Sequence, residues 1–361
     1  MSERGVLLVS PYDLSVPGGV QGQAAAMSLE LRRRGRRVAL AAPGLVEARE
    51  LADAGVLLLS AGPVRSLPAN GSVAPVGLSP GGSRRVRRWA ASHGPFVAHL
   101  HEPATPVTGW SLLRHHQGGL VGTFHRSGVD AVYRRAAPLL RRLLGRLDAA
   151  VAVSDAAAAT ALVGTGLICD VLFNGIDVDE FASAPRWPAT PRTVLFLGRD
   201  EPRKGRQVLL DAAALLDEDV TIWLTGEPPA DRADVGARLD WLGRISEDDK
   251  RARLAGATVL CAPSLGGESF GMVLLEGLAA GCTVVASDID GYREALGGHG
   301  ILVPPSDPVA LAEALRGALA APLPAAPGLA HARRWSMATL MDAYEERYEL
   351  AAAASGARRR R

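Results

Sequence analysis

The segment that most constrains the fold runs from Thr258 to Glu276. Its apolar start, Thr258–Ala262, is typical of a buried strand, and a glycine-containing turn then leads into a helix. Free backbone N–H groups and the helix dipole make the start of such a helix an anion-binding position. Glu268 lies in the turn and Glu276 lies about two helical turns later. Because a carboxylate accepts hydrogen bonds from a ribose diol but not from a phosphate, the segment predicts a site for a nucleotide diphosphate with a sugar at each end.

Strand–loop–helix units of this kind recur along the whole chain. A chain of 361 residues is too long for one compact core, so we expect two domains. The fold class predicted is α/β, with two Rossmann-like, doubly wound parallel sheets. The expected strands are Val6–Ser10, Arg37–Ala42, Val56–Ser60, Phe96–His101, Leu120–Phe124, Ala150–Val153 and Asp170–Leu172, then Thr193–Leu197, Val220–Thr225, Trp241–Gly243, Thr258–Ala262, Thr283–Ser287 and Ile301–Val303.

The domain boundary is predicted from proline content. The stretch Ala182–Pro191 holds three prolines and no periodicity, which is typical of a linker. We therefore expect an N-terminal domain over residues 1–181 and a C-terminal domain over residues 182–335. Pro68–Ala74 is expected to be irregular, His331–Ala354 is expected to form one long helix, and the basic tail, residues 355–361, is expected to be disordered.

Composition favours a globular cytoplasmic protein. Hydrophobic residues make up 48% and charged residues 22% of the chain, and no stretch approaches eighteen uncharged apolar residues. The three cysteines show no spacing typical of metal ligands and are expected to be small buried hydrophobes. No cofactor and no obligatory metal are expected. Basic residues outnumber acidic ones in residues 1–175 and the reverse holds afterwards, which indicates an anionic partner for the first half.

Two loops carry residues suited to a diphosphate. Gly18 and Gly19 precede the first helix and let a phosphate approach the backbone closely. The loop after strand Thr193–Leu197 contains Arg199 and Lys204, a guanidinium fork and a compact ammonium. The chain has only one other lysine, Lys250. A sequence that otherwise uses arginine as its basic residue is consistent with a specific need for an ammonium at Lys204.

Two further clusters have more than one interpretation. A short helix that ends at Trp89 is expected to carry a basic cluster, which is either a solvated helix face or a surface that contacts anionic lipid at a membrane. The cluster consists of Arg84, Arg85, Arg87, Arg88 and Trp89. His99 and His101 lack a third metal ligand, whereas His125 ends a strand where substrate binds in doubly wound sheets.

These residues resemble the retaining GT-B glycosyltransferases of family 4. Gly18-Gly19, the loop Leu197–Gly205 and the Glu268-x7-Glu276 spacing are similar to the three donor-site elements of that family. Within it, the chain is most similar to the actinobacterial phosphatidyl-myo-inositol mannosyltransferases. The resemblance implies two domains that face a cleft and a C-terminal helix, residues 336–354, that packs back on the N-terminal domain.

The resemblance also implies roles for individual residues. Donor binding is expected from Gly18, Gly19, Arg199, Lys204, Glu268, Ser269, Phe270, Gly271 and Glu276, and catalysis from His125, Arg199, Lys204 and Glu268. Acceptor binding is expected from Tyr12, Asn70, Ser72 and His125. The implied reaction moves mannose from GDP-mannose to an acceptor hydroxyl, with retention and without a metal, at the inner face of the plasma membrane.

The sequence departs from the lipid mannosyltransferases on the acceptor side. Those enzymes carry a tyrosine before Asn-Gly-Ser and an arginine shortly after it, whereas this chain has Ala69 and Pro75. Phosphatidylinositol is therefore one candidate acceptor, and a soluble inositol phosphate, glycan or secondary metabolite is another, with a UDP-sugar as an alternative donor.

Functions outside this class fit less well. A non-catalytic nucleotide-sugar-binding module would not need both glutamates, Arg199 and Lys204. A dehydrogenase would need Gly-x-Gly-x-x-Gly, which Pro17–Gly22 does not match. Nucleic-acid binding is not supported, because the basic residues of the chain are not interleaved with aromatic residues that could stack on bases.

Overall fold

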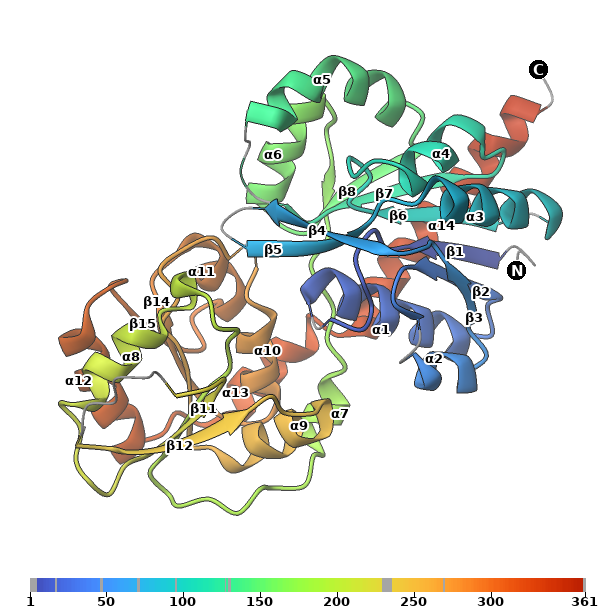
Figure 1. Cartoon of the computed structure of the whole chain (residues 1–361). Helices are drawn as coiled ribbons and strands as arrows, with labels where there is room; N and C mark the ends of the chain where they lie inside the picture. Colours follow the sequence, from blue (N-terminus) through green and yellow to red (C-terminus); the bar gives the residue numbers. More distant parts are fainter. Residues whose placement is uncertain are drawn as a thin grey trace. The chain divides into compact units, whose positions relative to one another are not determined.

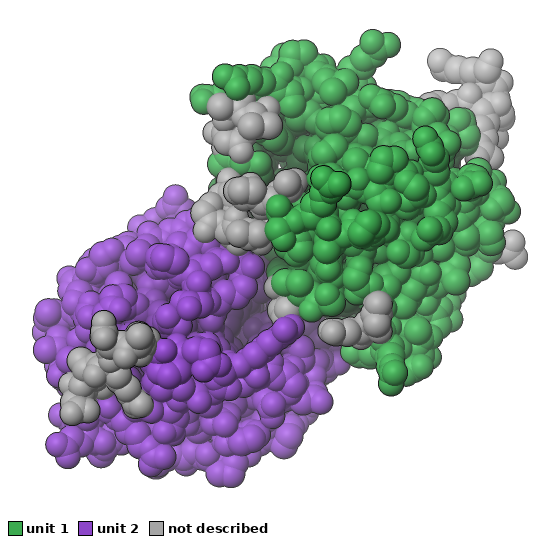
Figure 2. Space-filling model, in the orientation of Figure 1, with its two compact units in different colours: residues 1–175, 337–361 green, residues 176–336 purple. Residues whose placement is uncertain are grey.

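The computed structural model describes residues 5–16, 18–45, 48–69, 72–94, 96–126, 128, 131–228, 236–268 and 270–359. The chain forms two compact units, residues 1–175 with 337–361 and residues 176–336 (Figure 2). Each unit contains one parallel sheet with helices on both faces (Figure 1), so the predicted α/β, doubly wound fold is confirmed.

The sheet of unit 1 has the strand order β3-β2-β1-β6-β7-β8-β9. The strands are short, and the four adjacent strands β2, β1, β6 and β7 are buried throughout, as expected for a parallel sheet covered on both faces, whereas the edge strands β3 and β9 are partly or fully exposed. The strands of this sheet are β1 (Gly5–Val9), β2 (Val38–Ala42), β3 (Leu57–Ser60), β6 (Phe96–His101), β7 (Leu120–Phe124), β8 (Ala149–Ala152) and β9 (Asp170–Val171). The helices are α1 (Gly19–Arg33), α2 (Arg49–Asp53), α3 (Pro80–Ser92), α4 (Thr108–His115), α5 (Ala131–Leu144), α6 (Asp155–Thr165) and α14 (Met337–Arg359).

The last helix covers one face of this sheet. Leu340, Tyr344 and Tyr348 of α14 pack with Met27 of α1 and with Val121 of β7 in one core cluster. Helices α3 to α6 cover the other face with a second cluster. Because α14 is contributed by the far end of the chain, both termini are needed to complete the core of unit 1.

An antiparallel hairpin, β4 (Val64–Ala69) and β5 (Ser72–Gly77), lies outside the main sheet. We expected an irregular run at Pro68–Ala74, and that prediction is wrong. Tyr12 forms an isolated antiparallel bridge with Val76, which attaches the hairpin to the loop after β1. The pairing between the two strands could not be predicted from a stretch that contains two prolines, Pro68 and Pro75, because proline normally disfavours strands.

The sheet of unit 2 has the order β12-β11-β10-β13-β14-β15. Its strands are β10 (Thr193–Phe196), β11 (Thr221–Thr225), β12 (Arg238–Gly243), β13 (Val259–Ala262), β14 (Thr283–Ser287) and β15 (Ile301–Val303). Its helices are α7 (Val178–Ala182), the 3-10 helix η2 (Pro202–Lys204), α8 (Arg206–Ala213), α9 (Glu247–Gly256), α10 (Met272–Ala279), α11 (Asp290–Leu296), α12 (Pro308–Ala320) and α13 (Ala325–Arg333).

Three sequence-based boundaries differ from the structure. The division between the units falls at Ile176 rather than Ala182, because α7 buries Val178 and Phe181 within unit 2. The single helix expected over His331–Ala354 is two helices, separated by residues 334–336. The tail expected to be disordered is helical to Arg359, since α14 continues through it and Ser355 is buried.

The dependence of unit 1 on α14 can be measured. Leu340 is 1% exposed, whereas Leu350 on the same helix is 66% exposed. Leu340→Ala should lower the free energy of unfolding by roughly 2–5 kcal/mol, because it removes buried methyl groups and leaves a cavity. Leu350→Ala should change it by less than about 0.5 kcal/mol. Urea unfolding of both variants tests this, and equal effects would contradict the packing of α14.

Candidate functional site

The segment after β10 forms a tight loop that brings basic side chains to the carboxyl end of the sheet of unit 2. Lys204 ends η2, and Gly205 adopts a φ of 70° immediately before α8. A Cβ atom at Gly205 would overlap the carbonyl oxygen of Pro263, so glycine is required by both conformation and space. The N–H of Leu265 donates to the carbonyl of Arg203 over 2.8 Å. The loop after β10 is therefore held against the loop after β13.

A network of ion pairs joins these two loops. Glu268 is 2.7 Å from the Nζ of Lys204 and 2.6 Å from a guanidinium nitrogen of Arg203. Glu201 is 3.0 Å from Arg199 and 2.8 Å from Arg203. The structure thus brings together three predicted residues, Arg199, Lys204 and Glu268. It adds Glu201 and Arg203, which sequence analysis missed although they lie inside the same loop.

The second carboxylate of the pair is buried and has a partner of its own. Glu276 is 8% exposed, and Lys250 of α9 donates to it over 3.0 Å. Burial opposes the charged form of Lys250, but Glu276 and Glu247 outweigh it and raise the pKa of Lys250. The two lysines of the chain therefore each contact one carboxylate of the Glu268–Glu276 pair.

The start of α10 presents its main chain. Gly271 is the N-cap in the left-handed region, no side chain caps the helix, and its first turn holds no acidic residue. A Cβ at Gly271 would crowd the ring of Tyr292. Phe270 is 1% exposed and packs against Trp335, with ring centroids 4.8 Å apart, so its side chain is not available to a ligand. Ser269 lies outside the described residues.

In unit 1, Gly18 and Gly19 form the start of α1, where no side-chain cap and no acidic residue in the first turn compete for the free N–H groups. A Cβ at Gly19 would meet nothing within 4 Å. Packing within the described residues therefore does not require glycine at this position, and close approach of a ligand to the backbone remains the predicted reason for it.

His99 and His101 of β6 and His125, which follows β7, form a stacked column rather than a metal cage. The ring centroids of His99 and His101 are 4.5 Å apart, and those of His101 and His125 are 5.2 Å apart. His101 Nδ1 lies 3.0 Å from His125 Nε2. Burial lowers the pKa of His101 to about 3 and lowers the pKa of His99 and His125 well below the ordinary value. Among the residues that the structure describes, no cluster of three potential ligands could hold a metal.

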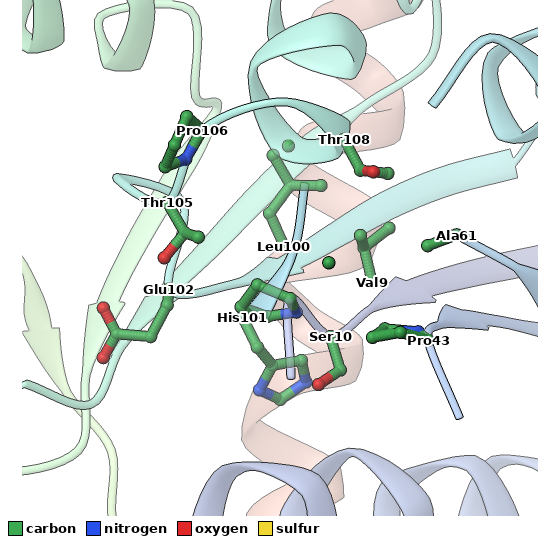
Figure 3. Close-up of a pocket in the computed structure, with 13 residues that line it drawn as sticks. Val9, Ser10, Pro43, Ala61, Leu100, His101, Glu102, Thr105, Pro106 and Thr108 are labelled. Carbon is green, nitrogen blue, oxygen red and sulfur yellow. The ribbon is translucent and has the colours of Figure 1, made fainter. Parts of the chain in front are cut away.

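Glu102 holds the loop that carries His125. Its carboxylate accepts the main-chain N–H of His125 over 2.7 Å, and its own φ is 49°, which is uncommon for a residue with a side chain. The Tyr12 hydroxyl is hydrogen-bonded to Thr105, and burial together with Glu102 raises the pKa of Tyr12. Figure 3 shows the adjoining pocket, to which Ser10, Pro43, Leu100, His101, Glu102, Thr105 and Thr108 contribute.

The remaining predicted positions that the structure describes belong to the β4–β5 hairpin and to α3. Ala69 pairs with Ser72 and Pro75 pairs with Ser66 across the β4–β5 hairpin, whereas Asn70 lies outside the described residues. On α3, Arg84, Arg85 and Arg88 are exposed and Arg87 is half-buried. The Trp89 ring is half-buried and contacts Phe96 and the stacked ring of His93.

A helix that crosses a membrane needs about 20 consecutive, mostly apolar residues. Within the described ranges no single helix is long and apolar enough to do so, although the bent pair α12 and α13 meets the length and composition criteria when taken together.

Two sequence families match the chain. The family described as Glycosyltransferase Family 4 matches residues 17–180, and the one described as Glycosyl transferases group 1 matches residues 191–321. The fold and the two matches, together with a relative that is 40% identical over 88% of this chain, show that the chain belongs to glycosyltransferase family 4, with the GT-B fold.

The chain is similar over most of its length to phosphatidyl-myo-inositol mannosyltransferases. It is 40% identical to that of Mycobacterium tuberculosis (strain ATCC 25618 / H37Rv), over 88% of this chain and 86% of the relative. It is 34% identical to that of Propionibacterium freudenreichii, over 80% and 78%. The mannosyltransferase similarity predicted from sequence motifs is thereby confirmed.

Solved structures share the fold at low sequence identity. The Anabaena protein HepE, in complex with UDP and glucose, superposes with a TM-score of 0.73 at 19% identity, covering 95% of this chain and 98% of that chain. Sucrose-phosphate synthase from Thermosynechococcus elongatus gives a TM-score of 0.72 at 19% identity, covering 97% and 100%.

The buried carboxyl of Glu102 predicts a pH effect on stability. Burial raises its pKa from 4.5 to about 7. The folded state then binds more protons than the unfolded state between these values, so the contribution of Glu102 to stability falls as pH rises from about 4.5 to about 7. Glu102→Gln removes this loss. The free energy of unfolding of the variant, relative to that of the wild type, should therefore rise by roughly 1–3 kcal/mol as the pH increases from 5 to 8.

Urea unfolding of both proteins at several pH values measures this difference. The buried histidines also make stability pH-dependent, but both proteins share them, so their contribution cancels in the comparison. If the difference in unfolding free energy between the two proteins does not change with pH, the pKa of Glu102 is not raised.

Proposed function

We propose that this glycosyltransferase moves mannose from GDP-mannose to a hydroxyl of phosphatidyl-myo-inositol or a related glycolipid, with retention of the anomeric configuration. The observation that carries the proposal is the similarity to enzymes of that name over 88% of the chain, with all four donor-site side chains, Arg199, Lys204, Glu268 and Glu276, present in two adjoining loops and α10 of unit 2. No metal is required in this proposal.

The charges of the donor site fit the transition state of glycosyl transfer. As the glycosidic bond breaks, negative charge develops on the leaving diphosphate and positive charge on the sugar ring. Arg199 and Lys204 are fixed cations that would stabilise the diphosphate, and they are positioned before the reaction begins. Glu268 would accept hydrogen bonds from hydroxyls of the transferred sugar, and Glu276 would accept them from hydroxyls of the ribose.

In this proposal the acceptor binds to unit 1. His125, Tyr12 and Ser72 would contact the acceptor, and Gly19 would offer its N–H to the donor phosphate. The exposed arginines of α3 would attract anionic headgroups, which supports peripheral binding to the inner face of the plasma membrane. Because Trp89 is partly buried against Phe96, this attraction is expected to depend mainly on the arginines.

A soluble acceptor is the second candidate. It is favoured by Ala69 and Pro75, which replace the tyrosine and arginine of the lipid mannosyltransferases. A relative named D-inositol 3-phosphate glycosyltransferase, from Mycobacterium avium, is 33% identical over 47% of this chain. A phosphorylated acceptor would need a cation elsewhere in place of the missing arginine.

Transfer assays separate these candidates. GDP-mannose, UDP-glucose and UDP-N-acetylglucosamine would each be tested with phosphatidylinositol liposomes, with free inositol phosphate and without acceptor. We expect mannose transfer to the liposomes and co-sedimentation of the protein with them. Transfer to inositol phosphate alone would favour the soluble acceptor, and transfer only from a UDP-sugar would overturn the choice of donor.

The role of Lys204 can be tested by removing its charge. Lys204→Ala should lower kcat by about 10²–10³-fold, because the ammonium stabilises charge that develops in the transition state. Arg192→Ala, which removes a cation that pairs with exposed carboxylates, is the matched control and should leave kcat unchanged. Equal rates for wild type and Lys204→Ala would overturn the donor-site assignment.

A further inference from the structure

The end of β6 contacts His125 at two separate points. The Glu102 carboxylate accepts the main-chain N–H of His125, and the ring of His101 is 3.0 Å from the His125 ring. Both histidines are buried, at 2% and 8% exposure. A hydrogen bond between two buried rings restricts rotation of His125 about its side-chain torsions, so the arrangement fixes both its backbone and its imidazole.

We propose that His101 is a positioning residue for sugar transfer, which donates from Nδ1 to His125 Nε2 and thereby makes His125 a hydrogen-bond donor at Nδ1. This inference rests on the proposed function, because it assigns His125 a hydrogen bond to an oxygen of the donor sugar or acceptor. His101 itself acts through His125 and needs no contact with either substrate.

The direction of this hydrogen bond follows from the other nitrogen of His101. Among the described residues, His101 Nε2 is buried and has no hydrogen-bond partner. An unpaired buried N–H is rarer in proteins than an unpaired buried acceptor. The proton of the neutral ring therefore belongs on Nδ1, and Nε2 is left as the bare acceptor. His101 then donates to His125 Nε2, and the single proton of neutral His125 must lie on its Nδ1.

A rigid support keeps His101 in place. Its ring stacks on His99, whose Nδ1 is 2.8 Å from the Tyr348 hydroxyl and whose Nε2 is 2.7 Å from Thr123 Oγ1. Thr123 Oγ1 is in turn 2.7 Å from the Tyr344 hydroxyl. Thr123 is on β7 and both tyrosines are on α14, so residues from two elements of unit 1 hold the column of histidines. Such a support is what positioning of a reactive group requires.

Two isosteric variants test the proposal. In His101→Asn the amide nitrogen lies close to the position of Nδ1 and can still donate to His125. In His101→Gln the amide lies closer to the position of Nε2, so the donor to His125 is lost. We expect kcat of His101→Asn within about fivefold of wild type and kcat of His101→Gln lower by about 10²-fold, with KM for the donor unchanged, because loss of alignment acts on the reaction step.

The tautomer gives a readout that does not depend on activity. Nitrogen NMR of histidine-labelled protein should show the His125 proton on Nδ1 in the wild type and in His101→Asn, and a mixture of tautomers in His101→Gln. A His125 proton on Nε2 in the wild type would overturn the inference. Equal losses of kcat in both variants, matched by equal losses of folded protein, would also overturn it, since His101 would then only support the fold.

The outcomes separate this inference from the proposed function. If the wild type transfers no sugar from any donor tested, the proposed function fails, and the NMR measurement still decides the hydrogen-bond direction. If the wild type transfers mannose and both variants match it, the proposed function stands and the positioning role of His101 is wrong.

Discussion

Burial of both faces of a parallel sheet is the constraint on which the structure of unit 1 depends. The face formed by strands such as β7 needs a helix, and the chain supplies it from its far end as α14. The same helix carries Tyr344 and Tyr348, whose hydroxyls bond to Thr123 and His99. Helix α14 therefore has two effects: it excludes water from the core, and it satisfies buried polar groups that would otherwise be costly. The histidines at the strand ends are positioned as a consequence of this packing.

In unit 2 the corresponding constraint is electrostatic. Carboxylates that are largely buried need opposite charges nearby, because water no longer stabilises them. Glu268 and Glu276 obtain these charges from Lys204 and Lys250, and Arg203 links Glu268 to Glu201. Arginine offers a rigid fork and lysine a compact charge, and Glu268 is paired with one of each, Arg203 and Lys204.

The two units differ in how far their chemistry can be assigned. The loops and helix α10 of unit 2 hold all the charged residues expected of a donor site, and backbone requirements at Gly205 and Gly271 fix the shape of the loops. Unit 1 has His125 and the attached hairpin, but it has Ala69 and Pro75 at two positions of that hairpin. Neither side chain can bind a phosphate. The family relationship therefore supports the donor more strongly than the acceptor.

The sequence by itself determined the two doubly wound sheets and the glycine-containing turns, because apolar strands and glycine positions are local signals. It also placed Arg199, Lys204 and Glu268 in adjoining loops. Only the tertiary structure decided the β4–β5 hairpin, the place of α7 in unit 2 and the break before α14. It alone paired His101 with His125 and His99 with Tyr348, 24 and 249 residues apart. The physical reason is that hydrogen bonds between distant residues leave no periodic trace in the sequence; they arise from the way packing brings the elements together.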